Sequence, residues 1–458
     1  MRYLLSVFAL ATVASAGLGQ QPSQSATGTS LVPPPETVVP PECALASPPA
    51  SAPVLRPGDS LCVSRAGAIA GALIANPQMQ VAAAQAQQAR AARVQGVALP
   101  DPTFGAAWAG STAPFGIGGL TSEVFGASIT IPFFDKFRLN GRIGTAGIRQ
   151  SESDSVAVRH AIASQTAQTY DSLLGALRRR ANLHEADSLA GDFLKKTQAR
   201  FDAGTVARLD VVNAQVAVAQ AQNDLIANER DIANARSSLN RLLGRPLGAP
   251  LATADSLAVP APLPALSALE RAALDNRPEL ASLVHRQQGA HATTSLAREF
   301  WLPDLTIGIS KDFLAGPTPG YLNTGVAFPI PIFYWNHAKG EIAQARFRED
   351  ELAATYRDLQ AAVGQDVRVA YATASTALRQ AVFIRDQLLP ASRQAYRIAA
   401  ASYGLGSSSA LEVNAARVAL VSAESQYTVA LAAANGARAD LERAVATPLA
   451  MFETGASQ

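Results

Sequence analysis

Charged and aromatic residues are scarce in this chain of 458 residues, at 16% and 6% against 48% hydrophobic residues. Beyond the N-terminus, no run approaches the roughly 18 uncharged apolar residues that a membrane-spanning helix needs, which excludes a polytopic helical membrane protein. The 38 Lys and Arg residues nearly balance the 36 Asp and Glu residues, so the formal net charge is only +2. No basic field exists to hold a nucleic-acid backbone, and we expect no nucleic-acid partner.

Motifs of catalytic and cofactor sites are also missing. The sequence contains no HExxH, no GxSxG, no phosphate-binding GxxxxGKS/T and no GxGxxG after an expected strand. Its five histidines are scattered, and two cysteines and three methionines do not supply a path of soft ligands for metal ions. We therefore predict that the protein is not an enzyme and has no metal site and no cofactor.

The N-terminus has the features of an export signal. A short positive start precedes an apolar stretch over residues 4–13, and Ala14-Ser15-Ala16 is a small-x-small cleavage signal. We predict a signal peptide over residues 1–16 and a Pro- and Ser-rich disordered linker over residues 17–58. No cysteine directly follows the apolar stretch, so we expect no N-terminal lipid anchor.

Cys43 and Cys62 are the only cysteines. An exported, oxidising compartment permits a disulfide between them, which would pin the end of the linker. Two free thiols fit the sequence equally well, because spacing alone gives no geometry. Both states are left open at this point.

The chain contains an internal repeat. The segment from Phe201 to Arg241 aligns without gaps with the segment 202 positions later, from Tyr403 to Arg443. Three shorter motifs recur in the same order: Asn76-Pro77 with Asn276-Arg277-Pro278, Leu99-Pro100-Asp101 with Leu302-Pro303-Asp304, and Ile131-Pro132-Phe133-Phe134 with Ile330-Pro331-Ile332-Phe333. The repeat predicts a duplicated unit of helix, helix, two strands and two long helices.

The expected boundaries follow from this unit. The first repeat covers residues 59–244 and the second covers residues 265–447, with an inter-repeat connection over 245–264 and a C-terminal tail over 448–458. Strands are expected at about 101–112, 121–134, 303–313 and 321–333. Long helical hairpins are expected at about 138–244 and 338–447.

Composition and periodicity support the long helices. Good helix formers dominate them, and before the hairpin turns Pro390 is their only proline. Apolar residues recur at a seven-residue spacing that is typical of a coiled-coil seam: Val211, Val218, Leu225, Ile232 and Leu239. A helix of some sixty residues would be about 90 Å long, so we expect the helices to pack against one another lengthwise.

Gly204 and Gly406 each lie between two long helices, where a residue able to adopt positive φ can end one helix and reverse the chain. We expect Thr205 or Ser407 to cap the following helix. Asp210 and Glu412 would then lie near its positive end. The pattern predicts two helical hairpin tips.

The expected strands alternate in character. Leu305, Ile307 and Ile309 share one face of the segment 303–313, and each expected strand has about ten residues, enough to cross a bilayer at a tilt. Four strands cannot close a spanning barrel, because the smallest have about eight and open edges in lipid would leave backbone groups unpaired. Three copies would supply twelve strands and a useful lumen, so the count favours a trimer.

The order of these motifs from about residue 59 to 447, above all Phe201-Asp202-Ala203-Gly204 with Leu209-Asp210-Val211, resembles the outer-membrane efflux protein family, the TolC-like outer-membrane factors of tripartite efflux pumps and type I secretion systems. The resemblance implies a mainly α fold with transmembrane β structure. It implies a homotrimeric α-helical barrel in the periplasm, continued by a shared twelve-stranded β-barrel in the outer-membrane lipid of a Gram-negative-type bacterium.

The resemblance also assigns roles at the tips. A periplasmic adaptor, itself bound to an inner-membrane pump, would contact residues 200–208 and 402–410, and the tip residues assigned to docking are Gly204, Thr205, Gly406, Ser407 and Ser408. Glu412 matches an acidic ring of the periplasmic aperture, whereas the second acidic position is Ala415 here. Tyr403 and Asp210 match an inter-helix contact, and Ser408 replaces the arginine of another.

The function implied is that of an exit duct, which passively conducts substrates from the adaptor and pump to the exterior. The alternative is a secreted or periplasmic structural coiled-coil protein without channel activity. A periplasmic adaptor is a third reading, but such proteins carry one hairpin within folded β-domains rather than two duplicated halves. Neither the substrate nor the particular adaptor and pump can be read from the sequence.

Overall fold

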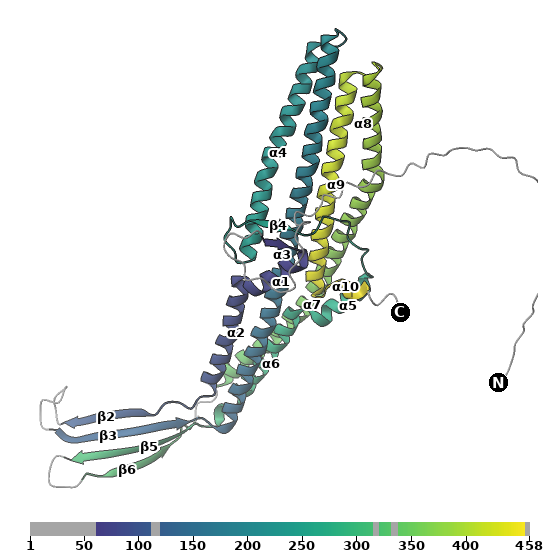
Figure 1. The fold of residues 1–458 in the computed structure, drawn as a ribbon. Coiled ribbons are helices and arrows are strands. Elements are labelled where there is room, and N and C mark those ends of the chain that lie inside the picture. The colour runs from purple at the N-terminus through teal and green to yellow at the C-terminus, as the bar shows by residue number, and fades with distance from the viewer. Residues whose placement is uncertain (1–60, 111–119, 315–319, 331–337, 454–458) are drawn as a thin grey trace, which may run out of the picture. The chain divides into compact units, whose positions relative to one another are not determined.

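The computed structural model describes residues 61–110, 120–314, 320–330 and 338–453. Its element order confirms the predicted duplication (Figure 1). The first repeat comprises α1 (Arg65–Ala75), α2 (Pro77–Gly96), β2 (Thr103–Gly110), β3 (Leu120–Ile131), α3 (Phe134–Asp202) and α4 (Arg208–Leu242). The second comprises α5 (Leu266–Asn276), α6 (Pro278–Arg298), a 3-10 turn (Glu299–Trp301), β5 (Leu305–Leu314), β6 (Leu322–Ala327), α7 (Ala338–Phe383), α8 (Leu389–Gly404) and α9 (Ala410–Val445).

Three short elements lie outside the two repeats. Strands β1 (Leu61–Val63) and β4 (Leu251–Thr253) form a parallel pair, which joins the start of the first repeat to the connection between repeats. Helix α10 (Ala450–Glu453) follows the second repeat. The long helix of the second repeat has a π-helical turn at Ile384–Leu388 between α7 and α8. Pro390, which cannot donate a main-chain hydrogen bond, follows this turn as the second residue of α8.

The four longer strands form one antiparallel sheet in the order β2-β3-β5-β6, and Figure 1 shows them side by side. Strands β3 and β5 pair from Ser122 with Leu314 to Ile131 with Leu305, so the sheet itself joins the two repeats. Within the described part of the chain, β2 and β6 each pair on one side only. The sheet is therefore open at both edges.

Two predicted strands end earlier than expected. Strand β3 ends at Ile131 and not at residue 134, because Pro132 cannot donate to the ladder. Strand β6 ends at Ala327, before Pro329, rather than at residue 333. Residues 331–337, which include the last part of this prediction, lie outside the described residues.

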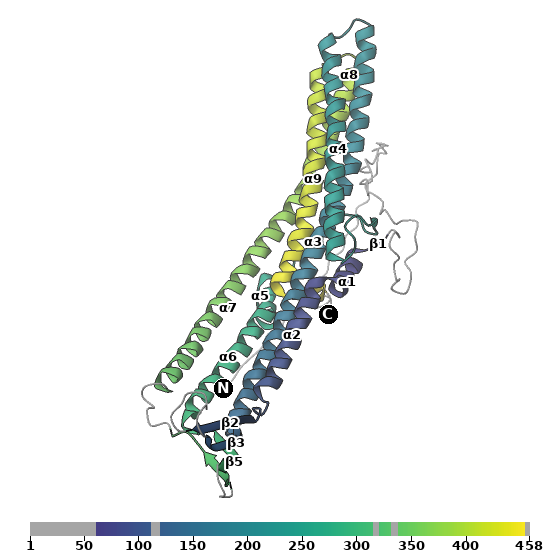
Figure 2. The same cartoon turned by 90° about the vertical axis from the view of Figure 1, so that its left-hand side faces the viewer.

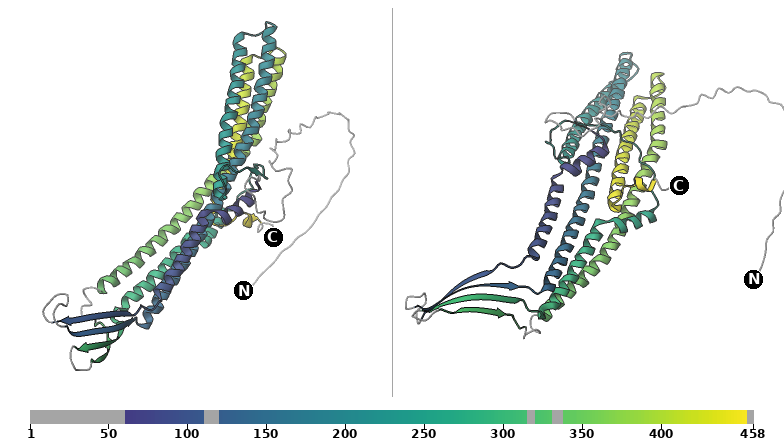
Figure 3. Two further views of the ribbon diagram at one scale, coloured as in Figure 1. Left: turned by 60° about the vertical axis from the view of Figure 1, so that its left-hand side comes forward. Right: turned by 60° about the horizontal axis from the view of Figure 1, so that its bottom comes forward.

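The helices pack lengthwise, as predicted. Helix α3 has 69 residues, which corresponds to about 100 Å. It packs against α4 and α2 in its own repeat and against α6 and α9 in the other (Figure 2). Both views of Figure 3 show the teal α3–α4 hairpin beside the yellow-green α8–α9 hairpin.

The seven-residue stripe of α4 forms the predicted seam. Val211, Ile232 and Leu239 are buried, whereas Val218 and Leu225 are half-buried. Ala214 and Ala221 are buried at the first two alternate positions of the same seam, and Asn228 is buried at the third. This pattern of a and d positions allows close approach of the neighbouring helix.

The duplication extends to a specific contact at the base of each hairpin. The Asn76 side chain, just before the proline that begins α2, donates to the carbonyl of Leu242 at the end of α4, with an N–O distance of 3.1 Å. Arg277, just before the proline that begins α6, donates to the equivalent carbonyl of Ala444 at 2.8 Å. Each pre-proline side chain thus caps the last helix of its own hairpin.

Among the helices of the described residues, none is both long and apolar enough to cross a membrane.

Candidate functional site

Both hairpin tips turn at the predicted glycines. Gly204 has a φ of +72° and Gly406 a φ of +83°, a region that residues with a Cβ rarely adopt. The amides of the next residues, Thr205 and Ser407, donate to carbonyls five positions back, at 2.9 and 3.0 Å. This hydrogen bond is typical of helix ends with a left-handed residue after the cap.

The prediction that Thr205 or Ser407 caps the following helix is wrong. Their hydroxyls donate to carbonyls of the preceding helix, at 2.9 and 3.1 Å. The N-cap residues are Ala207 and Ser409, two positions further on, because these are the residues with extended φ and ψ just before the helix begins.

Asp210 and Glu412 lie in the first turns of α4 and α9, as predicted. The Asp210 carboxylate accepts a hydrogen bond from the amide of Ala207 at 3.3 Å. Glu412 accepts one from the amide of Ser409 at 3.1 Å, and its own amide donates to the Ser409 hydroxyl at 3.2 Å. Both acids therefore complete helix caps, and their role at an aperture stays a prediction.

Tyr403 is almost completely buried, with 1% of its surface exposed. Its hydroxyl donates to Thr197 of α3 at 3.3 Å, and its ring centroid lies 5.8 Å from that of Phe193. The Tyr403 hydroxyl is thus directed to α3. The contact between Tyr403 and Asp210 that the resemblance implies stays a prediction. Ser408 is half-buried in the loop that precedes α9.

Arg200, in the last turn of α3, belongs to the range 200–208 expected to contact an adaptor, but sequence reasoning missed its contact with the second tip. One of its terminal guanidinium nitrogens donates to the main-chain carbonyl of Tyr403 at 2.8 Å, and the guanidinium carbon lies 4.4 Å from the centre of the Tyr403 ring. A basic residue in the last turn of a helix was a visible signal, but its partner lies more than two hundred residues away.

Large apolar side chains are exposed near both tips. Leu209 is 66% exposed and Leu411, its equivalent in the second repeat, is 76% exposed. Leu405 is 87% exposed in the second tip. Each tip thus presents at least one large apolar side chain to solvent.

The sheet has one apolar face and one small, polar face. Ile129 pairs with Ile307, and Ile131 with Leu305, on the apolar face. On the other face Thr130 pairs with Thr306, and their hydroxyl oxygens lie 2.9 Å apart. This confirms the predicted alternation. Apolar residues of the first face are exposed in the single chain, including Phe104 at 83%.

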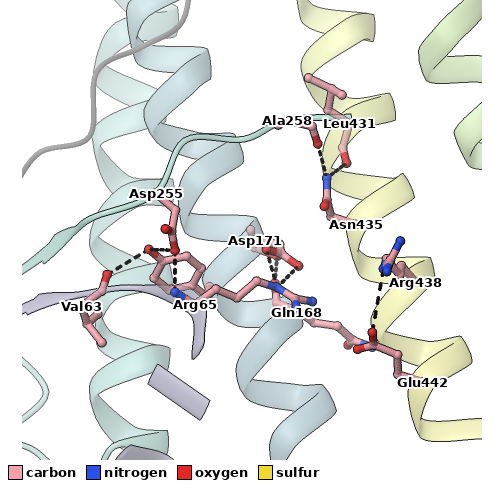
Figure 4. A network of polar contacts seen from close by, with 12 residues as sticks. Val63, Arg65, Gln168, Asp171, Asp255, Ala258, Leu431, Asn435, Arg438 and Glu442 are labelled. Atoms are coloured by element: carbon pink, nitrogen blue, oxygen red, sulfur yellow. Dashed lines mark hydrogen bonds and ion pairs between the residues drawn. The ribbon is translucent and has the colours of Figure 1, made fainter. Parts of the chain in front are cut away.

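A polar network fastens the connection between the repeats to α3 (Figure 4). The Tyr170 hydroxyl lies 2.9 Å from the Val63 carbonyl and 3.0 Å from the Asp255 carboxylate, which also accepts from the amide of Arg65. The Nε atom of Arg65 donates to both oxygens of the Asp171 carboxylate at 3.2 Å.

The same connection is also bound to α9. Asn435 donates to the carbonyl of Ala258 at 2.9 Å (Figure 4). Arg438 donates to the carbonyl of Ala261 at 3.2 Å. Residues 251–264 therefore cross from one hairpin to the other and join the two repeats by hydrogen bonds to both. We call this segment the belt.

Burial dominates the electrostatics of this network. It raises the pKa of the Asp171 carboxyl to about 6, although the Arg65 guanidinium opposes the shift. Burial also raises the pKa of the Tyr170 hydroxyl, and the negative charge of Asp255 adds to the effect. Arg65 therefore only partly offsets the desolvation of a carboxylate side chain that is 4% exposed.

Cys62 lies in β1 and is disulfide-bonded. Cys43 lies outside the described residues, so its pairing with Cys62 stays a prediction. Over the described ranges, no three His, Cys, Asp or Glu side chains are grouped in a way that could hold a metal ion.

The fold and the site define a class of protein: duplicated helical hairpins joined to an amphipathic sheet that is open at both edges. The chain matches the family described as "Outer membrane efflux protein" over residues 68–245 and 269–447. These two matches cover well over half of the chain and correspond to the two repeats. The chain therefore belongs to this family, whose members are outer-membrane proteins.

Individual relatives agree. The chain is 30% identical over 167 residues to a solvent efflux pump outer membrane protein, SrpC, of Pseudomonas putida. This match covers 34% of each of the two chains. The chain is 28% identical over 248 residues to a pyoverdine export outer membrane protein, OpmQ, of Pseudomonas aeruginosa. This match covers 50% of each of the two chains. The matches thus span about a third to a half of these relatives.

Comparison of folds extends over more of the chain. The outer membrane channel CmeC of Campylobacter jejuni superposes with a TM-score of 0.69 at 20% identity, over 83% of this chain and 85% of that one. The outer-membrane channel OprN superposes with a TM-score of 0.72 at 18% identity, over 84% of this chain and 90% of that one. This confirms the predicted fold class.

Proposed function

We propose that this chain forms the outer-membrane exit duct of a tripartite efflux or type I secretion system and conducts substrates passively. The observation that carries the proposal is the four-stranded sheet, amphipathic and open at both edges, continued by duplicated helical hairpins. The family to which the chain belongs supports it.

Three copies of the chain would complete the structure. In the sheet order β2-β3-β5-β6 neighbouring strands alternate in direction, so β6 of one copy runs antiparallel to β2 of the next. Joining the copies at these edges pairs the backbone groups that lipid would otherwise leave unsatisfied, at several kcal/mol each. The result is a homotrimer with a twelve-stranded barrel.

The two faces of the sheet fit this assembly. The exposed face with Phe104, Ile307 and Ile309 would contact lipid. The face with Thr130 and Thr306 would line a water-filled lumen. A single chain in water would expose the apolar face, and for this reason trimer formation and membrane insertion are coupled.

At the other end, the hairpin tips would receive a periplasmic adaptor that also binds an inner-membrane pump. The exposed leucines Leu209 and Leu411 supply apolar anchors at equivalent places of the two repeats. They flank the turns at Gly204 and Gly406, whose positive φ fixes the direction of the loops. Glu412, exposed beside the second turn, contributes one acidic ring to the aperture.

The proposal is tested by purifying the mature protein from the outer-membrane fraction in detergent. We expect a trimer by native mass and small, cation-selective conductance steps in a planar bilayer. A water-soluble monomer without conductance would overturn the channel proposal and favour a structural coiled-coil protein.

Adaptor binding needs its own measurement. We expect the double substitution Leu209→Ala and Leu411→Ala to weaken adaptor binding at least about tenfold, because truncating central apolar anchors typically costs about 2 kcal/mol or more. The matched control is Ile226→Ala, which removes an equally exposed apolar side chain from α4 far from the tip. Equal loss in both variants would contradict the assignment of the leucines.

A further inference from the structure

A hollow runs along α6 between α3 and α7, at the end of these helices that is next to the sheet. The three helices lie side by side there, with α6 in contact with both others (Figure 2). A pocket of about 1190 Å³ lies next to the sheet, and a second of about 440 Å³ lies further along the helices. Thr293, Ala345 and Arg348 line both pockets, so the two are continuous. We call them together the groove.

Each of the three helices presents one face to the groove. The lining residues of α3 recur at spacings of three and four, which places them on one side of the helix: Lys136, Asn140, Ile143, Gly147 and Gln150. Gly289 and Thr293 of α6 are spaced by four, and Ala345 and Arg348 of α7 by three. A different side of α3 contacts α2, where Arg93 donates to the Thr145 hydroxyl at 3.2 Å. The groove is therefore built by residues that the helical period brings together.

The groove lies on the polar side of the sheet. Asp304 lines the larger pocket and directly precedes Leu305, whose side chain is on the apolar face, so alternation places Asp304 on the opposite face. The Asp304 carboxylate accepts from Lys136 Nζ at 2.7 Å, and Lys136 lines the same pocket. In the proposed channel the polar side of the sheet faces the lumen, so the groove would be part of the inner wall of the duct.

The smaller pocket is basic. Its lining includes His285, Arg286 and Arg348 and, among the described residues, no acidic side chain. Arg348 is partly balanced, because its Nη1 atom donates to the two oxygens of Glu351, which lines the larger pocket, at 2.6 and 2.5 Å. Arg286 instead has a neutral partner on α3, since the oxygen of the Gln150 amide accepts from its Nε and Nη2 atoms at 3.2 and 3.3 Å. A guanidinium has five N–H donors, so Arg286 can keep this partner and still bind an anion.

Apolar and small residues form much of the remaining wall of the smaller pocket. Ile143, Ala146 and Leu352 supply carbon surface. Gly147 leaves room on the α3 side, because an added Cβ there would meet no heavy atom within 4 Å. The volume falls in the range of small-molecule sites, about 300 to 1,000 Å³, which combine an apolar lining with a few polar groups that orient the ligand. The lining fits an apolar body that carries one anionic group.

We infer that the groove binds organic anions, molecules with an apolar body and a carboxylate or sulfonate group, on their way through the duct. Arg286 contacts the anionic group, and the carbon surface of the smaller pocket contacts the body. The inference rests on the proposed channel, which makes the groove part of the inner wall. Glu412 lies at the other end of the helices, in the second tip, so its acidic ring and this basic pocket act at separate places.

The first test is isothermal titration calorimetry of the purified protein in a nonionic detergent at low ionic strength, where charges are weakly screened. The probes are naphthalene-1-sulfonate and 1-naphthylmethylammonium, which share the naphthalene rings and carry opposite charges, and each is also titrated into detergent alone. We expect the anion to bind at least about tenfold more tightly, because the basic side chains attract it and repel the cation. Equal affinities would overturn the inference, as would no binding of the anion, the result if a second copy filled the groove.

Removal of the guanidinium tests the role of Arg286. Arg286→Gln should weaken binding of naphthalene-1-sulfonate about threefold, the size expected for an ion pair at a site open to water. The matched control is Arg298→Gln, which removes an exposed arginine from the end of the same helix, outside the groove. An unchanged affinity in Arg286→Gln, or an equal loss in the control, would refute the assignment.

A larger side chain at Gly147 tests the location. Gly147→Phe should weaken binding at least about tenfold, because its ring would take up the space of the ligand. The matched control is Gly191→Phe, at another site of α3 where an added Cβ would meet no heavy atom within 4 Å. Thermal midpoints by circular dichroism establish that the variants are folded. Full affinity in a folded Gly147→Phe variant would place the ligand outside the groove and overturn the inference.

Calorimetry separates this inference from the proposed function, because it needs no conduction. A protein that conducts in a planar bilayer but does not prefer the anionic probe rejects the ligand of the groove and leaves the channel intact. A protein that binds the anion with the expected loss in Arg286→Gln, but does not conduct, rejects only the channel.

Discussion

Replacing Asp171 by Asn should change how the stability of this protein depends on pH. Asp171 is 2% exposed in the middle of α3, and both of its carboxylate oxygens accept from Arg65 Nε at 3.2 Å. Burial raises its pKa in the folded protein from 3.8 to about 6. The folded state therefore binds a proton more tightly than the unfolded state does.

The direction of the effect follows from this difference. The stability supplied by the protonated carboxyl is fully present below about pH 4 and is lost as the pH rises through about 6. A shift of about two units corresponds to at most about 3 kcal/mol, since one unit is 1.36 kcal/mol. The side-chain amide of the Asp171→Asn variant cannot ionise, so this contribution to the pH dependence should vanish.

The assay is thermal unfolding of the detergent-solubilised protein by circular dichroism at several pH values from 4 to 7. We expect the wild-type midpoint to fall by a few degrees more than that of Asp171→Asn across this range. Asp224→Asn, an exposed site on α4, is the matched control and should follow wild type. Parallel curves for Asp171→Asn and wild type would refute the assignment of burial as the dominant cause.

Three further predictions concern the helix ends. Gly244→Ala should destabilise the protein by at least about 1 kcal/mol, because Gly244 has a φ of +64° and an added Cβ would lie 2.6 Å from the Ala75 carbonyl oxygen. The control is Gly248→Ala, where an added Cβ meets open space, and equal thermal midpoints of the two variants would contradict the argument. Arg277→Ala should lower the unfolding free energy by about 2 kcal/mol through the buried Ala444 carbonyl that it leaves unpaired, as measured by denaturant titration; no change would count against the capping role. Glu412→Gln should reduce the cation selectivity measured by reversal potential, and an unchanged value would remove Glu412 from the aperture.

Local chemistry is the part of the structure that sequence reasoning predicted well. Gly204 and Gly406 adopt the expected positive φ, and the heptad positions from Val211 to Leu239 form the expected seam. Each of these features depends on residues within a few turns of one another. The predicted strand ends were less accurate, because the strands end before Pro132 and Pro329 although the apolar pattern continues beyond these prolines.

Contacts between distant segments were the part that sequence reasoning missed. Thr205 and Ser407 were assigned to the following helix, yet both bond back to the preceding one. Arg200 was assigned only to the range 200–208 expected to contact an adaptor, and its bond to the carbonyl of Tyr403 was not predicted. The hydrogen bonds of Asp255, in the belt, with Tyr170 and Arg65 could not be predicted from the sequence either. Such partners depend on how whole helices align, which no local pattern encodes.

The sequence by itself determined the duplication, the helical hairpins, the alternation of the strands and the family to which the chain belongs. Periodicity and turn chemistry act over a few residues, so a linear pattern is enough to define them. Only the tertiary structure decided which helices lie side by side, and with them the partners of Arg200 and Tyr403 and the raised pKa of Asp171. Burial and hydrogen bonding between distant segments are properties of packing, and they exist only once the two repeats are brought together.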